Sequence, residues 1–199
     1  MSPYPSSLRA ISIINPYAMF IGLGIKPYEF RTWTTSFRGL CLLHVSASTE
    51  CEEEFGPFLE SGEINKTEIK GMRKAVIGFA EMTGTVWDEE YQQWGHRMES
   101  PALFPAPIPC PGALNYWTPY PNKPEQSKAF QQAWNLIEAE DYNKASPEEY
   151  RFNFEDWGLE PLSALKYPLE AAEPLDEPPA QPRIFLAGPG GHVTEHLLE

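Results

Sequence analysis

Proline crowds one stretch of this sequence: eight of the residues 101–124 are proline. Proline has a fixed φ and lacks a backbone N–H, so no helix can run through such a stretch. The stretch therefore predicts an extended, partly rigid connector. Within it, the segment Gly112–Trp117 can form one more strand. The regular elements of the fold must come mainly from the residues on either side.

Hydrophobic periodicity places those elements. Apolar runs or alternating patterns predict strands, and apolar residues at i, i+3, i+4 and i+7 predict helices. Asn15 before Pro16 is typical of a helix start, and Thr49 with Glu52 fits a capping box. Asp88 can cap a helix containing Trp87, Tyr91, Trp94 and Met98. The predicted strands are 10–14, 27–33, 40–45 and 75–86, and the predicted helices are 16–23, a short acidic one from 49, 88–98 and 127–139.

Charge is divided unevenly along the chain, whose formal net charge is −13 with 15 basic and 28 acidic residues. Residues 1–49 hold four basic side chains against one acidic, a net of +3. The remaining residues hold 11 basic and 27 acidic side chains, a net of −16. Such a molecule repels polyanions on average, which excludes nonspecific coating of DNA or of an anionic membrane. Any nucleic-acid site must be local.

Cysteine content and hydropathy restrict the compartment. The chain has three cysteines, Cys41, Cys51 and Cys110, without a C-x-x-C spacing, which argues against a disulfide scaffold and a zinc knuckle. It has no run of 18 apolar residues and no signal-peptide pattern at its start. We expect a reduced, soluble, cytoplasmic protein with no membrane partner, no metal and no cofactor. The sequence does not indicate an oligomeric state.

Three linked segments carry the most information: Asn15–Ala18, Gly24–Arg31 and Arg38–Ser46. They read Asn-Pro-Tyr-Ala, G-x-K-x-x-E-x-R and an Arg-Gly turn leading into an apolar strand. Their order and spacing resemble the activating signal cointegrator homology (ASCH) domain. The resemblance covers residues 8–120. It implies an α+β fold, a small β-barrel of the PUA-like kind with flanking helices. Residues 121–199 are then a C-terminal extension, first helical and then extended, acidic and proline-rich.

The second segment predicts a binding site. On a strand, Glu29, Arg31 and Trp33 project to one face. A carboxylate, a guanidinium and an indole can hydrogen-bond a base edge, hold a phosphate and stack on a ring. Lys26 joins them if Gly24–Lys26 is a loop. We expect a nucleotide or a single-stranded RNA segment to bind there, at residues Gly24, Lys26, Glu29, Arg31, Trp33 and Arg38.

Structural roles are open for the same side chains. Glu29 and Arg31 can form an ion pair that only stabilises the fold, and Arg38 can fasten its own turn. Trp33 suits the core as well as it suits a stacking platform. His44, inside an apolar run, is typical of a hydrogen-bonded core histidine rather than a catalyst.

A second reading is enzymatic. The resemblance extends to small amidohydrolases that deacylate acetylcytidine with a lysine, a threonine and a glutamate. Lys26 matches that lysine, but Glu29 stands where the threonine is expected. A neighbouring carboxylate stabilises the ammonium form of Lys26, the opposite of what a nucleophilic lysine needs. If hydrolysis occurs, Glu29 is the general base for water, while Lys26 and Arg31 stabilise the oxyanion. Glu81 is a candidate for the third position.

A third reading is a protein-interaction module in which the acidic extension covers or replaces the basic face. The extension itself holds one faint motif, His192 and His196 at i and i+4. In a glycine-rich tail this spacing is typical of a solvated segment rather than of a zinc site.

Overall fold

A computed structural model of the chain describes residues 3–145, 186–187 and 193–194. The chain divides into two units, Met1–Leu165 and Lys166–Glu199. The elements of the first unit follow one another as β1 (Arg9–Ile13), α1 (Tyr17–Gly22), β2 (Tyr28–Arg31), β3 (Gly39–Val45), the 3-10 helix η1 (Glu52–Phe55), α2 (Gly56–Ser61), α3 (Lys66–Met72), β4 (Ala75–Asp88), β5 (Gln93–Pro109), β6 (Tyr116–Trp117), α4 (Pro124–Glu138) and β7 (Asn143–Lys144). In the second unit, β8 (Leu186–Ala187) pairs with β9 (Val193–Thr194).

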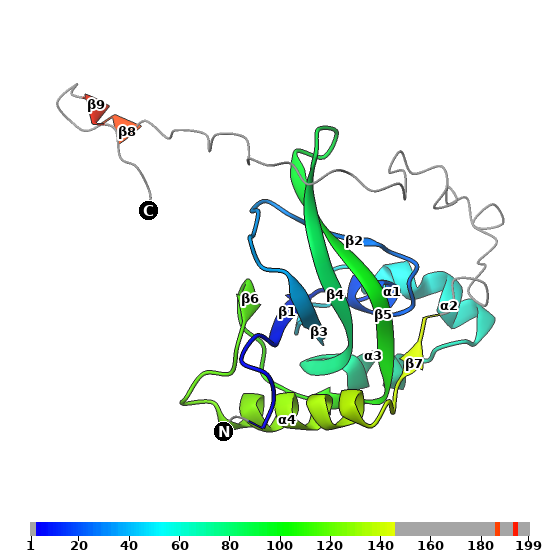
Figure 1. Cartoon of the computed structure of the whole chain (residues 1–199). Coiled ribbons are helices and arrows are strands. Elements are labelled where there is room, and N and C mark those ends of the chain that lie inside the picture. Colours follow the sequence, from blue (N-terminus) through cyan, green and yellow to red (C-terminus); the bar gives the residue numbers. More distant parts are fainter. Residues whose placement is uncertain (1–2, 146–185, 188–192, 195–199) are drawn as a thin grey trace. The chain divides into compact units, whose positions relative to one another are not determined.

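The first unit is an α+β fold built on one mixed sheet. Its strands lie in the order β2-β5-β4-β3-β1-β6, with β7 paired to β5. β1 and β3 run parallel, because the chain passes through α1 and β2 between them, and the other neighbours are antiparallel. The sheet curls into a half-barrel with helices packed around it (Figure 1). Curling brings the two ends of the strand order, β2 and β6, toward each other.

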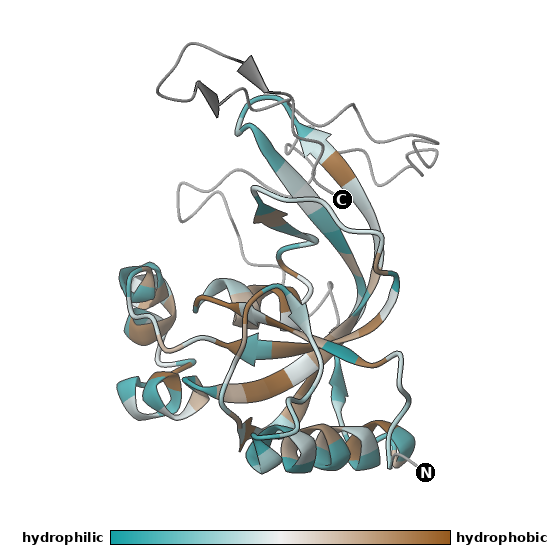
Figure 2. Cartoon of the chain, turned by 90° about the vertical axis from the view of Figure 1, so that its left-hand side faces the viewer, coloured by the Kyte–Doolittle hydropathy of each residue, from teal (hydrophilic) through white to brown (hydrophobic). Residues whose placement is uncertain are grey.

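Side chains alternate between two apolar cores along the central strands, as the two-residue period of a strand requires. In β3, Cys41, Leu43 and Val45 belong to the first core, which also contains residues of α1, α2 and α3. Leu42 belongs to the second core. Figure 2 shows these strands as the brown, hydrophobic centre of the first unit. Both faces of the sheet are therefore covered in its middle.

α4 closes the second core. Its residues Ala129, Phe130 and Ala133 are buried together with Trp117 of β6 and Ile108 of β5. The predicted helix at 127–139 is thus confirmed, with a start three residues earlier at Pro124. The predicted domain boundary after residue 120 stays a prediction, but α4 and β7 beyond it pack on the sheet.

The predicted strands at 10–14, 27–33, 40–45 and 75–86 are confirmed within a few residues at each end, as is the helix at 16–23. Asn15 does not cap that helix: its side chain makes no capping bond and is fully buried. Thr49 does not cap the acidic helix either. η1 follows Cys51, and the capping box of this region is formed by Asn65 and Glu68 at the start of α3.

The helix predicted at 88–98 is wrong. β4 and β5 form one long hairpin there, and Trp87 pairs with Trp94 across it. Asp88 still accepts a bond from the N–H of Tyr91, at 2.9 Å, but this bond closes a turn. Aromatic cross-strand pairs stabilise a hairpin, and the seven-residue spacing of these tryptophans mimics a helical period.

The proline-rich stretch is extended as predicted, but it is not a free connector. β5 runs on to Pro109 and pairs with β4 through Leu103 and Ile108. Between these two positions the register shifts, and Pro105 and Pro107 lie exposed in the irregular part. A bulge is where a strand tolerates proline, because no ladder hydrogen bond is required there. The strand predicted within Gly112–Trp117 is only Tyr116–Trp117.

Apart from residues 186–187 and 193–194, the extension beyond residue 145 lies outside the described residues, and so do the predictions for His192 and His196. No helix in the described part of the chain combines the length and the apolar character that crossing a membrane requires. Among the same residues, no group of three or more His, Cys, Asp or Glu side chains is placed to hold a metal ion.

Candidate functional site

The site residues predicted from the sequence gather around β2, at one end of the sheet. The loop before β2 begins where α1 ends. Gly24 has a φ of +76°, which glycine adopts without steric cost. The N–H groups of Ile25 and Lys26 both donate to the carbonyl of Phe20, at 2.9 and 3.1 Å. Gly24–Lys26 is therefore a loop, and it directs Lys26 back toward the strand that follows.

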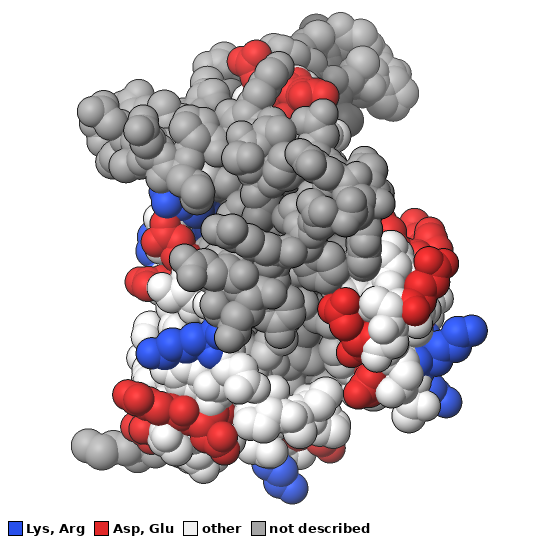
Figure 3. Space-filling view, turned by 90° about the vertical axis from the view of Figure 1, so that its right-hand side faces the viewer, with Lys and Arg blue, Asp and Glu red and all other residues white. Residues whose placement is uncertain are grey.

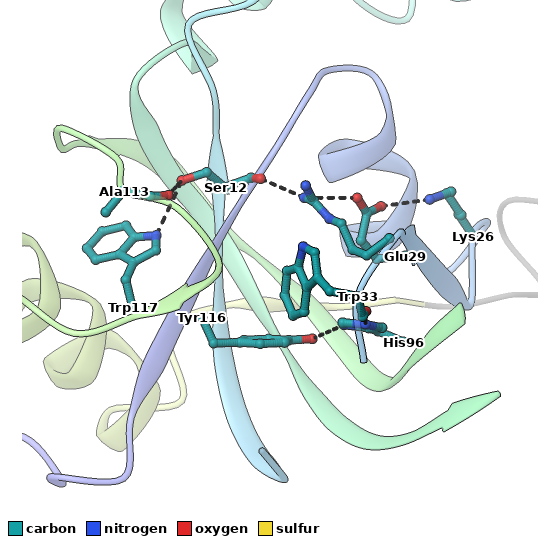
Figure 4. A network of polar contacts seen from close by, with 9 residues as sticks. Ser12, Lys26, Glu29, Trp33, His96, Ala113, Tyr116 and Trp117 are labelled. Atoms are coloured by element: carbon teal, nitrogen blue, oxygen red, sulfur yellow. Dashed lines mark hydrogen bonds and ion pairs between the residues drawn. The ribbon is translucent and has the colours of Figure 1, made fainter. Parts of the chain in front are cut away.

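Glu29 is the centre of a charged cluster. Its carboxylate accepts a hydrogen bond from Lys26 Nζ through Oε2 at 2.7 Å and forms an ion pair with Arg31 Nη2 through Oε1 at 3.1 Å. Figure 4 shows the side chains of Lys26 and Glu29 pointing toward each other. Glu29 is only 6% exposed, whereas the side chains of Lys26 and Arg31 are 22% and 27% exposed. A buried carboxylate thus carries two cations that reach the surface.

Aromatic rings also hold the Lys26 ammonium. Its Nζ lies 5.1 Å from the ring centroid of Tyr17 in α1 and 5.6 Å from that of Phe30 in β2. The Tyr17 hydroxyl in turn donates to Glu54 Oε1 at 2.5 Å. Cation–π attraction and the ion pair with Glu29 act in the same direction. They fix the position of Lys26 at the junction of α1 and β2.

Arg31 connects β2 to β1, which is not its neighbour in the strand order. Its Nη2 donates to the carbonyl of Ser12 at 2.7 Å. The Ser12 hydroxyl donates to the carbonyl of Ala113 at 2.8 Å and accepts from Trp117 Nε1 at 3.3 Å. These bonds form one chain of contacts from the charged cluster to β6 (Figure 4). Arg31 therefore closes the curl of the half-barrel as well as neutralising Glu29.

A second contact closes the curl beside the first. His96 of β5 lies opposite Glu29 in the ladder, and its ring stacks on Tyr116 of β6. His96 Nε2 donates to the carbonyl of Trp33 at 2.9 Å. Its Nδ1 is then free to accept from the Tyr116 hydroxyl, at 3.0 Å. Trp33 packs edge-on against both rings.

Burial fixes the protonation of this pair. It lowers the pKa of His96 below the ordinary 6.5, although the bond to the Trp33 carbonyl works in the opposite direction. It raises the pKa of Tyr116. At neutral pH the imidazole is therefore uncharged and the phenol holds its proton. The donor and acceptor roles above are the ones that these protonation states require.

Arg38 and Glu81 do not join the charged cluster. Arg38 is exposed and donates to the backbone carbonyls of Thr35 and Phe37, so it fastens its own turn. Glu81 is exposed on β4, opposite Leu40 and Glu99 in the ladder. His44 is buried and donates from Nε2 to the carbonyl of Cys110 at 2.9 Å, the core role predicted for it. Gly24 contributes the positive φ that allows the loop before β2 to form.

His96, Tyr116 and Ser12 also belong to this site but were not among the residues predicted from the sequence. A strand pattern at 93–97 would have placed His96 and Trp94 on one face, but the tryptophan spacing favoured a helix. Ser12 takes part through its backbone carbonyl and its hydroxyl. No pattern in the neighbouring sequence predicts these contacts. Tyr116 is in contact only because the sheet curls.

The assembled site offers defined chemistry. A carboxylate has about four acceptor positions in all, so Glu29 can still accept from an N–H donor while it holds Lys26 and Arg31. The two cations can contact an anionic group. In the described part of the chain, Arg31 Nε is buried and has no hydrogen-bond partner.

Comparison with known proteins adds no assignment. No family model matches the sequence, and no curated protein matches it. The site therefore has to be judged on its own geometry.

Charged side chains are also spread over the rest of the surface. Figure 3 shows acidic side chains on both sides of one face, with lysines and arginines at separate positions. The acidic residues of η1, Glu52, Glu53 and Glu54, are among the surface groups, and Glu52 is paired with Arg73. Lys26, Arg31 and Glu29 together carry one net positive charge, although the chain as a whole is acidic.

Proposed function

We propose that the chain is an ASCH-like domain with a PUA-like barrel, and that it binds a nucleotide, free or within single-stranded RNA, at Lys26, Glu29 and Arg31. The observation that carries this proposal is the state of Glu29. A carboxylate that is 6% exposed and held by two partly exposed cations is an acceptor fixed in position. The curled mixed sheet with packed helices supports the barrel part of the proposal.

The parts of a nucleotide match the parts of the site. Imino and amino groups on a base edge can donate to Glu29, and a phosphate can contact Lys26 or Arg31. Partly exposed aromatic rings stand beside the cluster, among them Trp33. Because one acidic and two basic side chains meet, the site carries one net positive charge. This suits one or two phosphates, whereas the net charge of −13 opposes the binding of a long polyanion.

The hydrolase alternative requires Glu29 to activate a water. Both of its oxygens already hold cations, at 2.7 and 3.1 Å, so neither faces a water without competition. Lys26 serves as an ion-pair donor, and Glu81 stands outside the cluster. We therefore place binding ahead of hydrolysis. The interaction-module alternative depends on the acidic extension, residues 121–199.

The test is a calorimetric titration of the full chain with the four common nucleoside monophosphates. We expect at least one to bind, and Lys26→Ala to weaken it by about 10-fold or more, the size of one charge-assisted hydrogen bond. Arg38→Ala is the matched control. It also removes one cation of the same segment, but one outside the cluster, and we expect a change of less than about 3-fold.

Three results would contradict the proposal. If no mononucleotide or short RNA binds wild-type protein at millimolar concentration, the binding function is wrong. If Lys26→Ala and Arg38→Ala weaken binding equally, the site is not at Glu29. If acetylcytidine is turned over and Lys26→Ala abolishes the turnover, the hydrolase reading replaces binding.

A further inference from the structure

Three strands align a row of side chains next to the proposed site. Arg31 of β2 lies opposite Trp94 of β5, and Trp94 lies opposite Trp87 of β4. Directly paired residues of antiparallel strands project to the same face. We call Arg31, Trp94 and Trp87 the Arg31 row. The adjacent row, Glu29, His96 and Thr85, projects to the same face because it lies two residues along each strand.

The two tryptophans form a partly exposed surface at the end of this row. Their ring centroids are 5.3 Å apart and their planes are inclined at 63°. Both rings are half-buried. They belong to the β4–β5 hairpin, which extends past β2 in Figure 1. An aromatic surface that continues directly from a cationic side chain is a platform on which bases of a single strand can stack.

The charges on this face permit a phosphate backbone. In the paired segments 28–31, 84–88 and 93–97, the charged side chains on the face are Glu29 and Arg31, and Lys26 joins them from the loop. Asp88 follows Trp87 in β4, so its side chain projects to the opposite face. It is buried and accepts a hydrogen bond from the N–H of Tyr91. Glu89 and Glu90 lie in the turn beyond the strands. The face thus carries a net positive charge.

The dimensions fit more than one base. Neighbouring strands are about 4.8 Å apart, so the row spans roughly 10 Å from Arg31 to Trp87. Bases along one strand of a duplex follow each other about every 3.4 Å. A nucleotide held at Glu29 and Arg31 therefore leaves room on the row for its neighbour.

We propose that Trp94 and Trp87 stack the base next to the one held at Glu29, so that the ligand is a single RNA strand of two or more nucleotides rather than a mononucleotide. This inference rests on the proposed function and deepens it. The competing explanation is that the two tryptophans only stabilise the hairpin as a cross-strand pair. The two explanations differ in how affinity depends on the length of the ligand.

The experiment compares uridine monophosphate with single strands of two to five uridylates, at one fixed salt concentration, on the full chain. We expect wild-type affinity to rise by about 5- to 100-fold between the mononucleotide and the trimer, the range of one stacked base. We expect Trp87→Ala to lose most of this gain while its mononucleotide affinity stays within about 2-fold. Trp87→Phe should keep part of the gain.

Tyr91→Ala is the matched control, because it removes an aromatic ring from the same hairpin. Tyr91 is 64% exposed and contacts Phe30, which projects to the opposite face of β2. We expect its length dependence to equal that of wild-type protein. Circular dichroism melting of each variant shows whether the hairpin change has damaged the fold.

The outcomes separate the inference from the function. If the monophosphate binds and wild-type affinity does not rise with length, the stacking inference is overturned and the binding site stands; this result needs no variant. If Trp87→Ala keeps the full length dependence, the extra base lies elsewhere and the inference is again wrong. If neither uridine monophosphate nor any uridylate strand binds, and none of the other three monophosphates binds either, the proposed function itself fails.

Discussion

Two consecutive residues of β6 project into two different regions of the protein. Tyr116 lies where the ends of the curled sheet meet. We call this region the seam; it consists of Ser12, Arg31, Trp33, His96 and Tyr116. Trp117 enters the second core, beneath α4. Each ring packs against a buried histidine: Tyr116 stacks on His96, and Trp117 stands edge-on to His44.

The two regions are held by different forces. In the seam, directional bonds dominate: both nitrogens of His96 have partners, and Arg31 spans to the Ser12 carbonyl. In the second core, apolar contact dominates. In the described part of the chain each region has one buried nitrogen without a hydrogen-bond partner, Arg31 Nε in the seam and His44 Nδ1 next to Trp117. A hydrogen-bonding group can exchange its protein partner for a group of a ligand, whereas side chains buried in an apolar core cannot reach a ligand. The seam is therefore suited to recognition and the second core to stability.

The largest expected effect comes from the second core. Phe130 is fully buried against Trp117 and Tyr4. We expect Phe130→Ala to lower the free energy of unfolding by about 3–5 kcal/mol, because it removes a buried ring and leaves a cavity. Urea denaturation followed by circular dichroism measures this change. Nucleotide affinity of the folded fraction should stay the same.

Gln132→Ala is the control for this prediction, since Gln132 is exposed on the same helix. Its unfolding free energy should stay within about 0.5 kcal/mol of wild type. A loss of less than about 1 kcal/mol for Phe130→Ala would show that α4 contributes little to the fold, and the comparison between the two regions would collapse.

A smaller effect is expected in the seam. Tyr116→Phe removes the hydroxyl that donates to His96 Nδ1 and leaves that acceptor buried. We expect a loss of about 1–3 kcal/mol in unfolding free energy, the cost of one unsatisfied buried group. The same urea denaturation measures it.

Tyr4→Phe makes the identical chemical change on the other side of the sheet, where the hydroxyl lies 3.3 Å from Ser127 Oγ. We expect it to cost less than about 0.5 kcal/mol. Equal losses for the two variants would mean that hydrogen bonding is no more important in the seam than elsewhere.

The smallest effect is a pH dependence shared by both regions. Burial lowers the pKa of His96 and of His44 below 6.5. In the unfolded chain these imidazoles take up protons as pH falls through 6.5, whereas in the folded chain they do not, so the unfolded state binds more protons. Stability is thus full above about pH 6.5 and declines below it, by up to about 1.4 kcal/mol per pH unit for each histidine.

Urea denaturation at pH 7.5, 6.5 and 5.5 tests this dependence, with His96→Gln and His44→Gln compared with wild type. Each variant should flatten the decline by one histidine's share. The carboxylates titrate alike in all three proteins, so the difference between the curves isolates the imidazoles. Curves of equal slope would contradict the prediction for both regions.

Local patterns predicted most of the elements. Three elements followed from patterns of neighbouring residues, and all three are confirmed. They are β1 from its β-branched run, β4 from its alternation and α4 from its helical period. The prediction failed at the β4–β5 hairpin, because Trp87 and Trp94 are seven residues apart in sequence and directly opposite in the ladder. A spacing of seven residues puts two side chains on one face of a helix, and it can also put them opposite each other in a hairpin. The spacing alone therefore does not distinguish a helix from a hairpin.

The candidate site was predictable in part for the same reason. Lys26, Glu29 and Arg31 are close in sequence, so the two-residue period and one glycine loop suffice to bring them together. Ser12, His96 and Tyr116 come from three other strands, and their approach depends on how far the sheet curls. The curvature of the sheet results from the packing of both cores, so no single sequence motif predicts it.

The curl of the sheet ends in side chains and not in a backbone ladder. Arg31 and the Ser12 carbonyl, with His96 and Tyr116, form the joint between its ends. Every paired strand of the half-barrel can keep its backbone bonds while this joint loosens. If the proposed ligand takes over the bonds of Arg31, this joint opens, and the half-barrel can widen there without any strand unfolding.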